Sequence, residues 1–312
     1  MNLSHAYAAP PPRDVAATVL RTALGHGVTL FDTAALYGFG ANEALIGPVL
    51  KPHRAEVVLA SKCGTFRNDA GVRTIDGRPE TLKRTCDDSL RRLQTDVIDL
   101  YYLHRMDPHV PLEDSIGALS DLVRQGKIRA IGVSEVSAAT LRKIHAMHPV
   151  AAIQTEYSLW TRNPEIAVLD ACRELGIAFV AFSPLARGFL CGALQDPMTE
   201  LEPRDIRRRM PRFSAEHYPS NLRLLDEYGA IAREAGCTWA QLALAWLLAK
   251  EPFIVPIPGT RDPSHVTENM GASDIFLAPA LVTRLDALIN ERTVAGGRYN
   301  EATQQEIDTE NF

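Results

Sequence analysis

Four titratable side chains in the first third of the chain could together deliver a proton to a substrate. They are Asp32, Tyr37, Lys62 and His104. Free tyrosine and lysine have pKa values near 10 and 10.4, so a tyrosine that exchanges a proton near neutral pH needs help. An ammonium group beside Tyr37 would stabilise the tyrosinate and lower its pKa, and Lys62 could supply that charge. Asp32 would hold Lys62 protonated, while His104 could orient a carbonyl oxygen or pass a proton.

Each of these residues also has an ordinary structural interpretation. Asp32 before Thr33 could cap a turn, and Tyr37 beside Gly38 could be a loop aromatic. Lys62 could be solvated, and His104 could be a buried histidine with satisfied hydrogen bonds. Three of the candidate segments end an apolar run, and strand ends are where a barrel of alternating strands and helices holds its chemistry. The joint pattern therefore favours the catalytic interpretation.

A segment near the end of the chain has the composition of a phosphate site. Residues 257–264 follow an apolar run and lead into a helical pattern. Gly259 permits close backbone approach, Thr260 and the helix amides can donate to phosphate, and Arg261 offers a planar charge. An ordinary capped turn is the alternative. Residues 38–40 lack the third glycine of a Gly-x-Gly-x-x-Gly motif, which disfavours a Rossmann domain.

These positions require a scaffold of alternating strands and helices. Helical spacing predicts helices at 14–26, 43–50, 79–93, 112–124, 138–146, 164–175, 222–235 and 239–249. Apolar runs predict strands at 28–31, 57–60, 97–103, 128–133, 151–155, 177–182 and 253–257. Continuous apolar strands between helices predict an α/β fold with a parallel sheet covered on both faces. A closed eight-stranded barrel needs one more strand, and residues 1–13, with three consecutive prolines, have the composition of a loop after a strand.

Composition narrows the classes of function. A chain of 312 residues with 46% apolar residues permits one large domain over residues 1–312. The net charge of −5 gives no basic face for nucleic acid, and the basic run 204–212 is expected to be a solvated loop, with an anion site as the alternative. No apolar stretch reaches the ~18 residues of a membrane span, so we expect a soluble cytoplasmic protein. Five scattered cysteines fit reduced thiols, and no metal site is expected.

Six segments resemble the aldo-keto reductase superfamily in order and spacing, above all the subgroup of perakine reductase and related bacterial and plant NADPH-dependent reductases. They are residues 31–38, 59–62, 99–105 with Asp107, 154–159, 182–185 and 256–260. The resemblance extends from residue 1 to about 299. It implies a (β/α)8 TIM barrel, NADPH bound in extended form and reversible reduction of an aldehyde or ketone. Members have a strand before the segment that residues 1–12 resemble, so we expect the first strand to be missing, with instability or a non-native closure as the result.

The resemblance also assigns roles. Tyr37 would be the general acid, Lys62 and Asp32 would tune it, and His104 would bind the carbonyl. Ser134 and Gln154 would hold the nicotinamide carboxamide, and Phe182 would stack on the nicotinamide ring. The pyrophosphate would be bordered by Ser183, Leu185, Arg187 and Gly188. The 2′-phosphate would contact Gly259, Thr260 and Arg261, and the adenine would contact Glu268 and Asn269. His265 stands where many members have an arginine, with Asp262 close by. Arg261 favours NADPH, and NADH stays possible.

The resemblance also predicts which residues line the substrate pocket. A small carbonyl compound would contact Phe66, Arg105, Met106 and Trp160, although Trp160 could equally pack beneath the loop 186–220.

The rival function is a nucleotide-sensing regulatory subunit similar to potassium-channel β subunits, which share this fold and its four catalytic residue types. A sugar-isomerase or aldolase barrel is disfavoured. The polar tail 293–312 is expected to close over part of the barrel or to stay mobile. Neither the physiological substrate nor the oligomeric state follows from the sequence.

Overall fold

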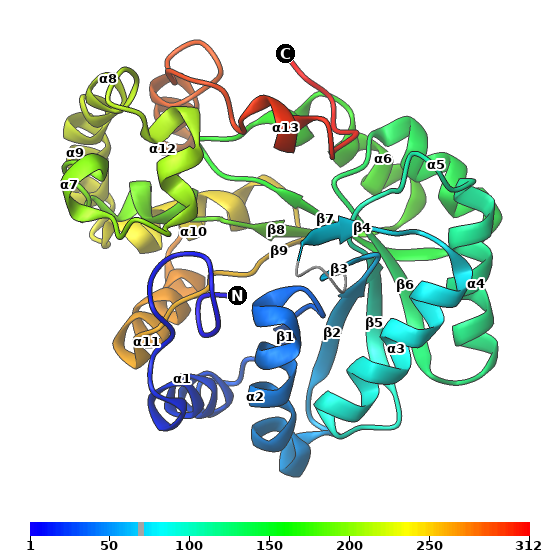
Figure 1. Cartoon of the computed structure of the whole chain (residues 1–312). Coiled ribbons are helices and arrows are strands. Elements are labelled where there is room, and N and C mark those ends of the chain that lie inside the picture. The colour runs from blue at the N-terminus through cyan, green and yellow to red at the C-terminus, as the bar shows by residue number, and fades with distance from the viewer. Residues whose placement is uncertain (68–71) are drawn as a thin grey trace.

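The seven expected strands form one parallel sheet in the computed structural model, which describes residues 1–67 and 72–312. Their spatial order is β1-β2-β5-β6-β7-β8-β9, and the sheet curls around its own interior (Figure 1). The strands are β1 (Leu30–Asp32), β2 (Val58–Cys63), β5 (Ile98–Leu103), β6 (Ile128–Ser134), β7 (Val150–Glu156), β8 (Ala178–Phe182) and β9 (Ile254–Pro256). The predicted parallel α/β architecture is therefore confirmed, with strand ends shifted by a few residues.

Helices connect these strands and cover the outer face of the sheet (Figure 1). They are α1 (Arg13–Gly25), α2 (Ala41–Leu50), α3 (Pro79–Leu93), α4 (Leu112–Arg124), α5 (Ala138–Met147), α6 (Val168–Leu175), α7 (Pro197–Glu200), α8 (Tyr218–Leu222), α9 (Leu224–Ala235), α10 (Trp239–Lys250), α11 (Pro263–Met270), α12 (Pro279–Leu288) and α13 (Glu301–Gln304). Short 3₁₀ helices lie at Tyr37–Gly40, Lys51–His53, Asn163–Glu165, Ala186–Cys191, Ile206–Arg209, Pro211–Phe213 and Gly271–Asp274. None of the helices in the described ranges is long and apolar enough to span a bilayer.

Local signals set several helix boundaries. Pro79 at the first turn starts α3, and Gln94 ends it in the left-handed conformation. At α10, Thr238 and Gln241 form a reciprocal capping box. The expected helix 164–175 begins as a 3₁₀ turn before α6, whereas the expected helix 222–235 corresponds to α9, which begins at Leu224. The hairpin of β3 (Thr65–Arg67) and β4 (Arg73–Ile75) was not predicted.

Side chains of the sheet alternate between two apolar layers. The interior of the curled sheet holds a small cluster of Ala60, Leu100, Tyr102, Ala152 and Val180. Gly132 pairs with Tyr102 across the sheet, and a Cβ at Gly132 would lie 2.3 Å from the Tyr102 ring. Glycine at this position therefore makes the room that the tyrosine ring occupies.

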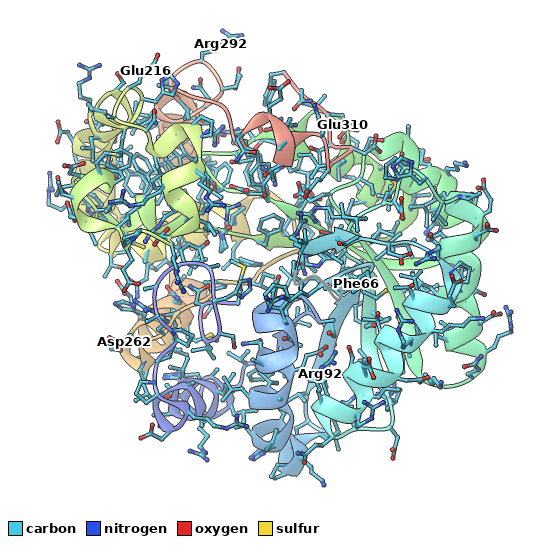
Figure 2. All side chains as sticks on the ribbon, viewed as in Figure 1. Phe66, Arg92, Glu216, Asp262, Arg292 and Glu310 are labelled. Atoms are coloured by element: carbon cyan, nitrogen blue, oxygen red, sulfur yellow. The ribbon has the colours of Figure 1, made fainter. Side chains whose placement is uncertain are left out.

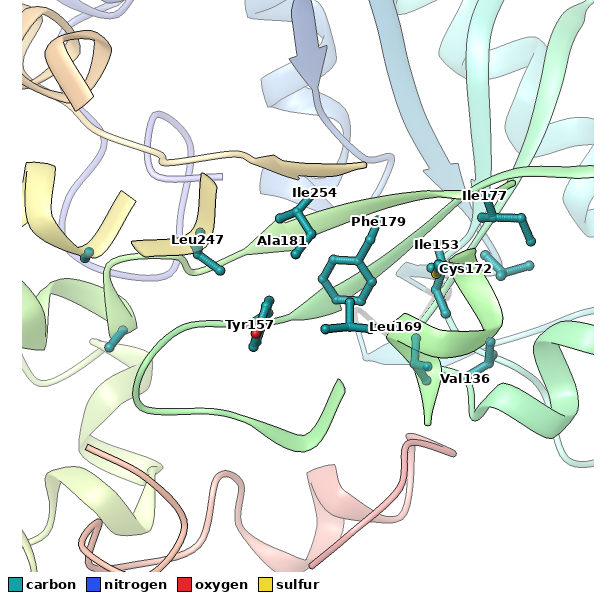
Figure 3. Packing of buried hydrophobic residues seen from close by; sticks show 14 of the residues in the cluster. Val136, Ile153, Tyr157, Leu169, Cys172, Ile177, Phe179, Ala181, Leu247 and Ile254 are labelled. Atoms are coloured by element: carbon teal, nitrogen blue, oxygen red, sulfur yellow. The ribbon is translucent and has the colours of Figure 1, made fainter. Parts of the chain in front are cut away.

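The larger apolar layer lies between the sheet and the helices. Phe179 of β8 meets Tyr157 edge to face with ring centres 5.7 Å apart, and Leu247 of α10 lies nearby (Figure 3). Both aromatic rings are fully buried. This layer fixes the outer face of each strand, so the alternate residues must face the interior.

The two edge strands of the sheet do not pair with each other. β1 and β9 stand at opposite ends of the strand order, and no strand of the described residues lies between them. Helices α1 and α11 lie side by side across this seam (Figure 1), and the His26 Nε2 and Thr267 Oγ1 atoms are 2.9 Å apart. Residues 1–12, which form turns and bends, lie against the same region.

The carboxy-terminal tail docks on the sheet's carboxyl end. Arg73 of β4 forms a two-bond ion pair with Glu306, at 2.6 and 2.7 Å. The Asp308 carboxylate accepts hydrogen bonds from Ser137 Oγ at 2.9 Å and Thr140 Oγ1 at 2.6 Å. Of the two states expected for the tail, closure over part of the barrel is the one observed.

The basic run 204–212 is not simply a solvated loop. Arg207 pairs with Asp205 at 2.7 Å. Arg212 donates to the carbonyl of Gly296 at 3.2 Å and to that of Trp160, and burial lowers its pKa to about 10. The expectation was wrong here because loop arginines can supply the hydrogen bonds that irregular backbone needs when tertiary packing buries it.

Candidate active site

Residues at alternate positions bring the candidate catalytic side chains together. In β1, β2, β7 and β8, a small or apolar residue in the interior is followed two positions later by a polar or aromatic one. The pairs are Leu30 and Asp32, Ala60 and Lys62, Ala152 and Gln154, and Val180 and Phe182. Parallel strands end at the same edge of the sheet, so the second members gather at one end of the interior.

Asp32, Lys62 and Gln154 form a buried hydrogen-bonded group there. The Lys62 ammonium donates to Asp32 Oδ1 and, at 2.8 Å, to the carbonyl of Thr33. Gln154 Nε2 donates to the second carboxylate oxygen of Asp32 at 2.8 Å. The Lys62 side chain is fully buried, and Asp32 is its only ion-pair partner in the described part of the chain. The pair therefore places a fixed positive charge beneath the cavity.

Tyr37 and His104 lie above this charge. The Lys62 ammonium nitrogen is 4.9 Å from the centre of the Tyr37 ring. The Tyr37 and His104 rings meet edge to face with centres 6.0 Å apart. His104 Nδ1 is buried and has no hydrogen-bond partner among the described residues. The structure thus brings all four candidate catalytic residues together.

The net pKa of Tyr37 differs from the sequence-based expectation. Burial raises the Tyr37 pKa above 10, and this effect outweighs the opposing charge of Lys62, which acts in the expected direction. The expectation failed because sequence reasoning counted the ammonium group but not the cost of burying a tyrosinate. Burial also opposes the charge of Lys62, yet Asp32 and Tyr37 raise the Lys62 pKa. Tyr37 is therefore a protonated phenol beside a permanent ammonium.

His104 is held neutral. Burial lowers its pKa well below 6.5, and the positive charges of Arg105, Lys62 and Arg73 lower it further. A neutral imidazole carries one N–H donor and one acceptor. His104 can therefore orient a carbonyl oxygen by a hydrogen bond, and it is not a reservoir of protons at neutral pH.

One cavity of about 1950 Å³ runs from this group to α11. All thirteen residues that the resemblance assigned to cofactor binding line it: Ser134, Gln154, Phe182, Ser183, Leu185, Arg187, Gly188, Gly259, Thr260, Arg261, His265, Glu268 and Asn269. Its volume exceeds the ~300–1,000 Å³ of a drug-sized site. Asn269 Oδ1 at the α11 end and His104 Nδ1 at the catalytic end are buried without partners among the described residues. Size, lining and unsatisfied atoms fit a dinucleotide with a substrate beside its reactive end.

The loop after β8 has a strained backbone where it borders the cavity. Ser183, Ala186 and Arg187 have φ values of 51°, 50° and 57°. The left-handed region costs a residue with a side chain about 1–2 kcal/mol, and such strain gathers where a site needs a particular backbone shape. Arg187 is further held by Glu156 at 2.7 Å. The loop is thus fixed in a shape that borders the expected pyrophosphate position.

The α11 end holds the expected phosphate segment. Asp262 caps α11 by accepting from Ser264 N at 2.8 Å, and Thr260 Oγ1 lies 3.2 Å from His265 Nδ1. Arg261 donates to the carbonyl of Ala9 at 3.1 Å and has no ion-pair partner in the described ranges. Asp262 thus satisfies one amide of the helix and places a negative charge beside the expected phosphate. The turn-with-cap interpretation and the phosphate interpretation both describe this segment.

Of the four expected substrate contacts, Arg105 lies in the described lining of the cavity. Phe66, Met106 and Trp160 are absent from that described lining. Trp160 is buried and stacks on Phe189 with ring centres 4.0 Å apart. Phe66 lies on the β3–β4 hairpin (Figure 2), and Met106 packs against the main core, so both stay predictions as substrate contacts. Trp160 is therefore a packing residue, which was the alternative left open.

Sequence reasoning missed a buried ionic cluster beside Phe182. Arg298, from the tail, donates to Glu135 at 2.7 Å and to Glu156 at 3.0 Å, and its guanidinium lies 5.8 Å from the Phe182 ring centre. Arg187 joins Glu156 to Tyr299, whose hydroxyl is 3.1 Å from Arg187 Nη2. The members are far apart in sequence and form no local motif; the only sequence signal was a polar residue just past each of two strand ends.

No metal site accompanies this chemistry within the described ranges. No three or more of their His, Cys, Asp and Glu side chains are arranged to hold a metal ion. The five cysteines, which are Cys63, Cys86, Cys172, Cys191 and Cys237, are free thiols.

Comparisons with known proteins agree on one family. A sequence model of the Aldo/keto reductase family matches residues 1–290. A probable aldo-keto reductase of Glycine max is 39% identical over 300 residues, covering 96% of this chain and 86% of that protein. The Schizosaccharomyces pombe protein named aldo-keto reductase yakc [NADP(+)] is 41% identical over 301 residues, covering 95% and 88%.

Solved structures show the same architecture. The glycerol dehydrogenase of Gluconobacter oxydans superposes with a TM-score of 0.84 at 27% identity, over 94% of this chain and 90% of that one. An aldo/keto reductase of Klebsiella pneumoniae, solved in complex with NADP and acetate, gives a TM-score of 0.70 at 28% identity, over 92% and 89%.

Proposed function

The chain belongs to the aldo/keto reductase family of NAD(P)H-dependent oxidoreductases, and on this premise we propose that it reduces an aldehyde or ketone to an alcohol with NADPH. The observation that carries the proposal is the convergence of Asp32, Tyr37, Lys62 and His104 at one end of a cavity that the expected cofactor residues line. The NADP named for the relative from S. pombe and bound in the structure from K. pneumoniae supports the choice of nucleotide.

The residues present would hold the nucleotide in an extended form along the cavity. Ser134 and Gln154 would contact the nicotinamide carboxamide, and Phe182 would supply an aromatic face for its ring. The strained loop at Ser183–Gly188 would follow the pyrophosphate. Arg261 would pair with the 2′-phosphate, which NADH lacks, so we expect tighter binding of NADPH. When bound, the reduced nicotinamide supplies a hydride to the carbonyl carbon.

Tyr37 acts as the proton donor in this proposal. Its hydroxyl gives a proton to the carbonyl oxygen as negative charge develops there. His104 donates a hydrogen bond to the same oxygen and holds it in place. The tyrosinate left on Tyr37 is stabilised by the Lys62 ammonium at its ring, and Asp32 keeps that ammonium charged and oriented. Gln154 restrains the Asp32 carboxylate.

Binding and turnover distinguish this function from its rival. Purified protein is titrated with NADPH and with NADH by quenching of tryptophan fluorescence, and oxidation of NADPH is then followed with 4-nitrobenzaldehyde. Tighter binding of NADPH together with turnover supports a reductase. Tight binding with no turnover of a panel of aldehydes and ketones supports a nucleotide-sensing subunit. Absence of binding of either nucleotide contradicts both.

A further inference from the structure

The charge of Arg105 has no carboxylate partner among residues 1–67 and 72–312. Arg105 follows His104 directly after β5, is half-buried and lines the cavity. Its Nη1 atom donates to the carbonyl of His104 at 2.6 Å and lies 3.3 Å from Ser134 Oγ. Both acceptors are neutral. The side chain is therefore oriented by the protein, while no carboxylate in the described part of the chain compensates its charge.

Other guanidinium groups that line the cavity are placed differently. Three of them have ion pairs: Arg73 with Glu306, Arg187 with Glu156 and Arg207 with Asp205. Arg209 and Arg261 also lack an ion pair in the described part of the chain, but they lie on the loop after β8 and before α11. Of these guanidinium groups, Arg105 is the one that combines a position next to His104 with a charge unpaired within the described ranges.

A half-buried cation without a counter-ion loses hydration, and for Arg105 the two neutral acceptors replace only part of it. The Arg105 Nη2 atom makes no hydrogen bond to the described residues, so its N–H groups are available to a ligand. Guanidinium groups match the geometry of carboxylates, with charge and paired donors in one plane. The missing partner is therefore best supplied by an anion that enters with the substrate.

We propose that Arg105 binds a carboxylate on the carbonyl substrate, so that the enzyme prefers acidic aldehydes or ketones to neutral ones of the same shape. This inference rests on the reductase function proposed above. Because His104 is neutral, the substrate's carboxylate meets a single fixed positive charge at the mouth of the catalytic group, and the Lys62 charge beneath is already balanced by Asp32.

The test compares two aldehydes that share one ring skeleton, one with an anionic carboxylate and the other with that group masked as a neutral methyl ester. Oxidation of NADPH is measured with 4-formylbenzoate and with its methyl ester, and the ratio of their kcat/KM values is taken as the specificity. A hydrogen-bonded ion pair predicts a ratio of about 10- to 100-fold in favour of the acid. The ratio is expected to fall by about the same factor in Arg105→Met and to be largely retained in Arg105→Lys.

A second measurement does not depend on how a variant folds. Benzoate and benzamide are compared as inhibitors of the unmodified enzyme against 4-nitrobenzaldehyde. Benzoate should inhibit about tenfold or more tightly than benzamide, and added salt should reduce the difference.

Each outcome has a separate meaning. A ratio near one in the unmodified enzyme, with equal inhibition by benzoate and benzamide, overturns the proposal for Arg105 while leaving the reductase function standing. A loss of NADPH affinity in Arg105→Met with an unchanged ratio also overturns it, and assigns Arg105 to the nicotinamide through Ser134. No turnover of either aldehyde, nor of the neutral panel, contradicts the reductase function itself.

Discussion

Replacing Arg298 by methionine should destabilise the protein far more than replacing an exposed arginine does. The Arg298 guanidinium pairs with Glu135 and Glu156, and all three side chains are buried, with 7%, 0% and 5% exposure. Methionine keeps much of the volume and removes the charge. Glu156 would retain Arg187, but within the described ranges Glu135 would keep as its one side-chain partner the backbone N–H of Glu156, at 2.9 Å.

The magnitude follows from this unequal loss. Removing one partner of a buried ion pair leaves an uncompensated charge and typically costs about 3–5 kcal/mol. We therefore expect the free energy of unfolding to fall by about 3–5 kcal/mol in Arg298→Met. The double variant with Glu135→Gln should recover part of this loss, because no unpaired charge then remains, with a coupling of about 1–3 kcal/mol.

The assay is urea unfolding followed by tryptophan fluorescence, with the free energy extrapolated to water. Arg91→Met is the matched control, because Arg91 is 74% exposed and pairs with Asp88 on the same helix. Such a surface pair contributes about 0–1 kcal/mol. If Arg298→Met unfolds within about 1 kcal/mol of Arg91→Met, the buried cluster does not anchor the tail.

Further changes should separate packing, cofactor and pH effects. Trp160→Ala should lower the free energy of unfolding by about 3–5 kcal/mol through loss of its stack on Phe189, with little change in KM for a small aldehyde; a raised KM at unchanged stability would return Trp160 to the substrate pocket. Arg261→Ala should weaken NADPH about 10- to 100-fold in a fluorescence titration and NADH much less; equal losses would contradict a 2′-phosphate contact. Burial opposes ionisation of Glu156, but Arg187 and Arg298 lower its pKa from 4.5 to about 2. The stability from this ionised carboxylate is present above pH 4.5 and should be lost as pH falls from 4.5 towards 2, and Glu156→Gln should flatten that part of the profile; an unchanged profile would contradict it. The pKa of His104 lies below its unfolded value of 6.5, so the free energy of unfolding should fall as pH drops below 6.5, by at most about 1.4 kcal/mol per pH unit. His104→Gln should reduce that slope, and a slope of the opposite sign would show a charged imidazole.

Features that depend on the alternation of side chains within one strand could be predicted from the sequence. Asp32 is the last residue of β1 and Lys62 is the last but one of β2, and the outer faces of both strands pack under helices, so strand alternation turns the two side chains inward. Gln154 and Phe182 also line the cavity, but their roles were assigned from the family resemblance and not from strand alternation. Helix α3 was predicted to both of its bounds, because Pro79 marks its first turn and its apolar residues follow helical spacing up to Leu93.

Features that depend on distant partners could not be predicted this way. Trp160 packs on Phe189 and meets Phe213 edge to face at 5.2 Å, and neither partner is near it in sequence. Arg298 and Glu135 are 163 positions apart. The sign of the net Tyr37 pKa shift was also missed, because burial competes with charge and only the folded structure shows how deep the phenol lies. Tertiary packing decides all three.

Tyr37→Phe tests the central claim most directly, because it removes the hydroxyl that is proposed to protonate the carbonyl oxygen and little else. NADPH binding is measured by fluorescence titration, and turnover of 4-nitrobenzaldehyde is measured on the same preparation. The account predicts that kcat falls about 10²- to 10⁴-fold while NADPH still binds. A variant that reduces the aldehyde at the rate of the unmodified protein would contradict Tyr37 as the proton donor.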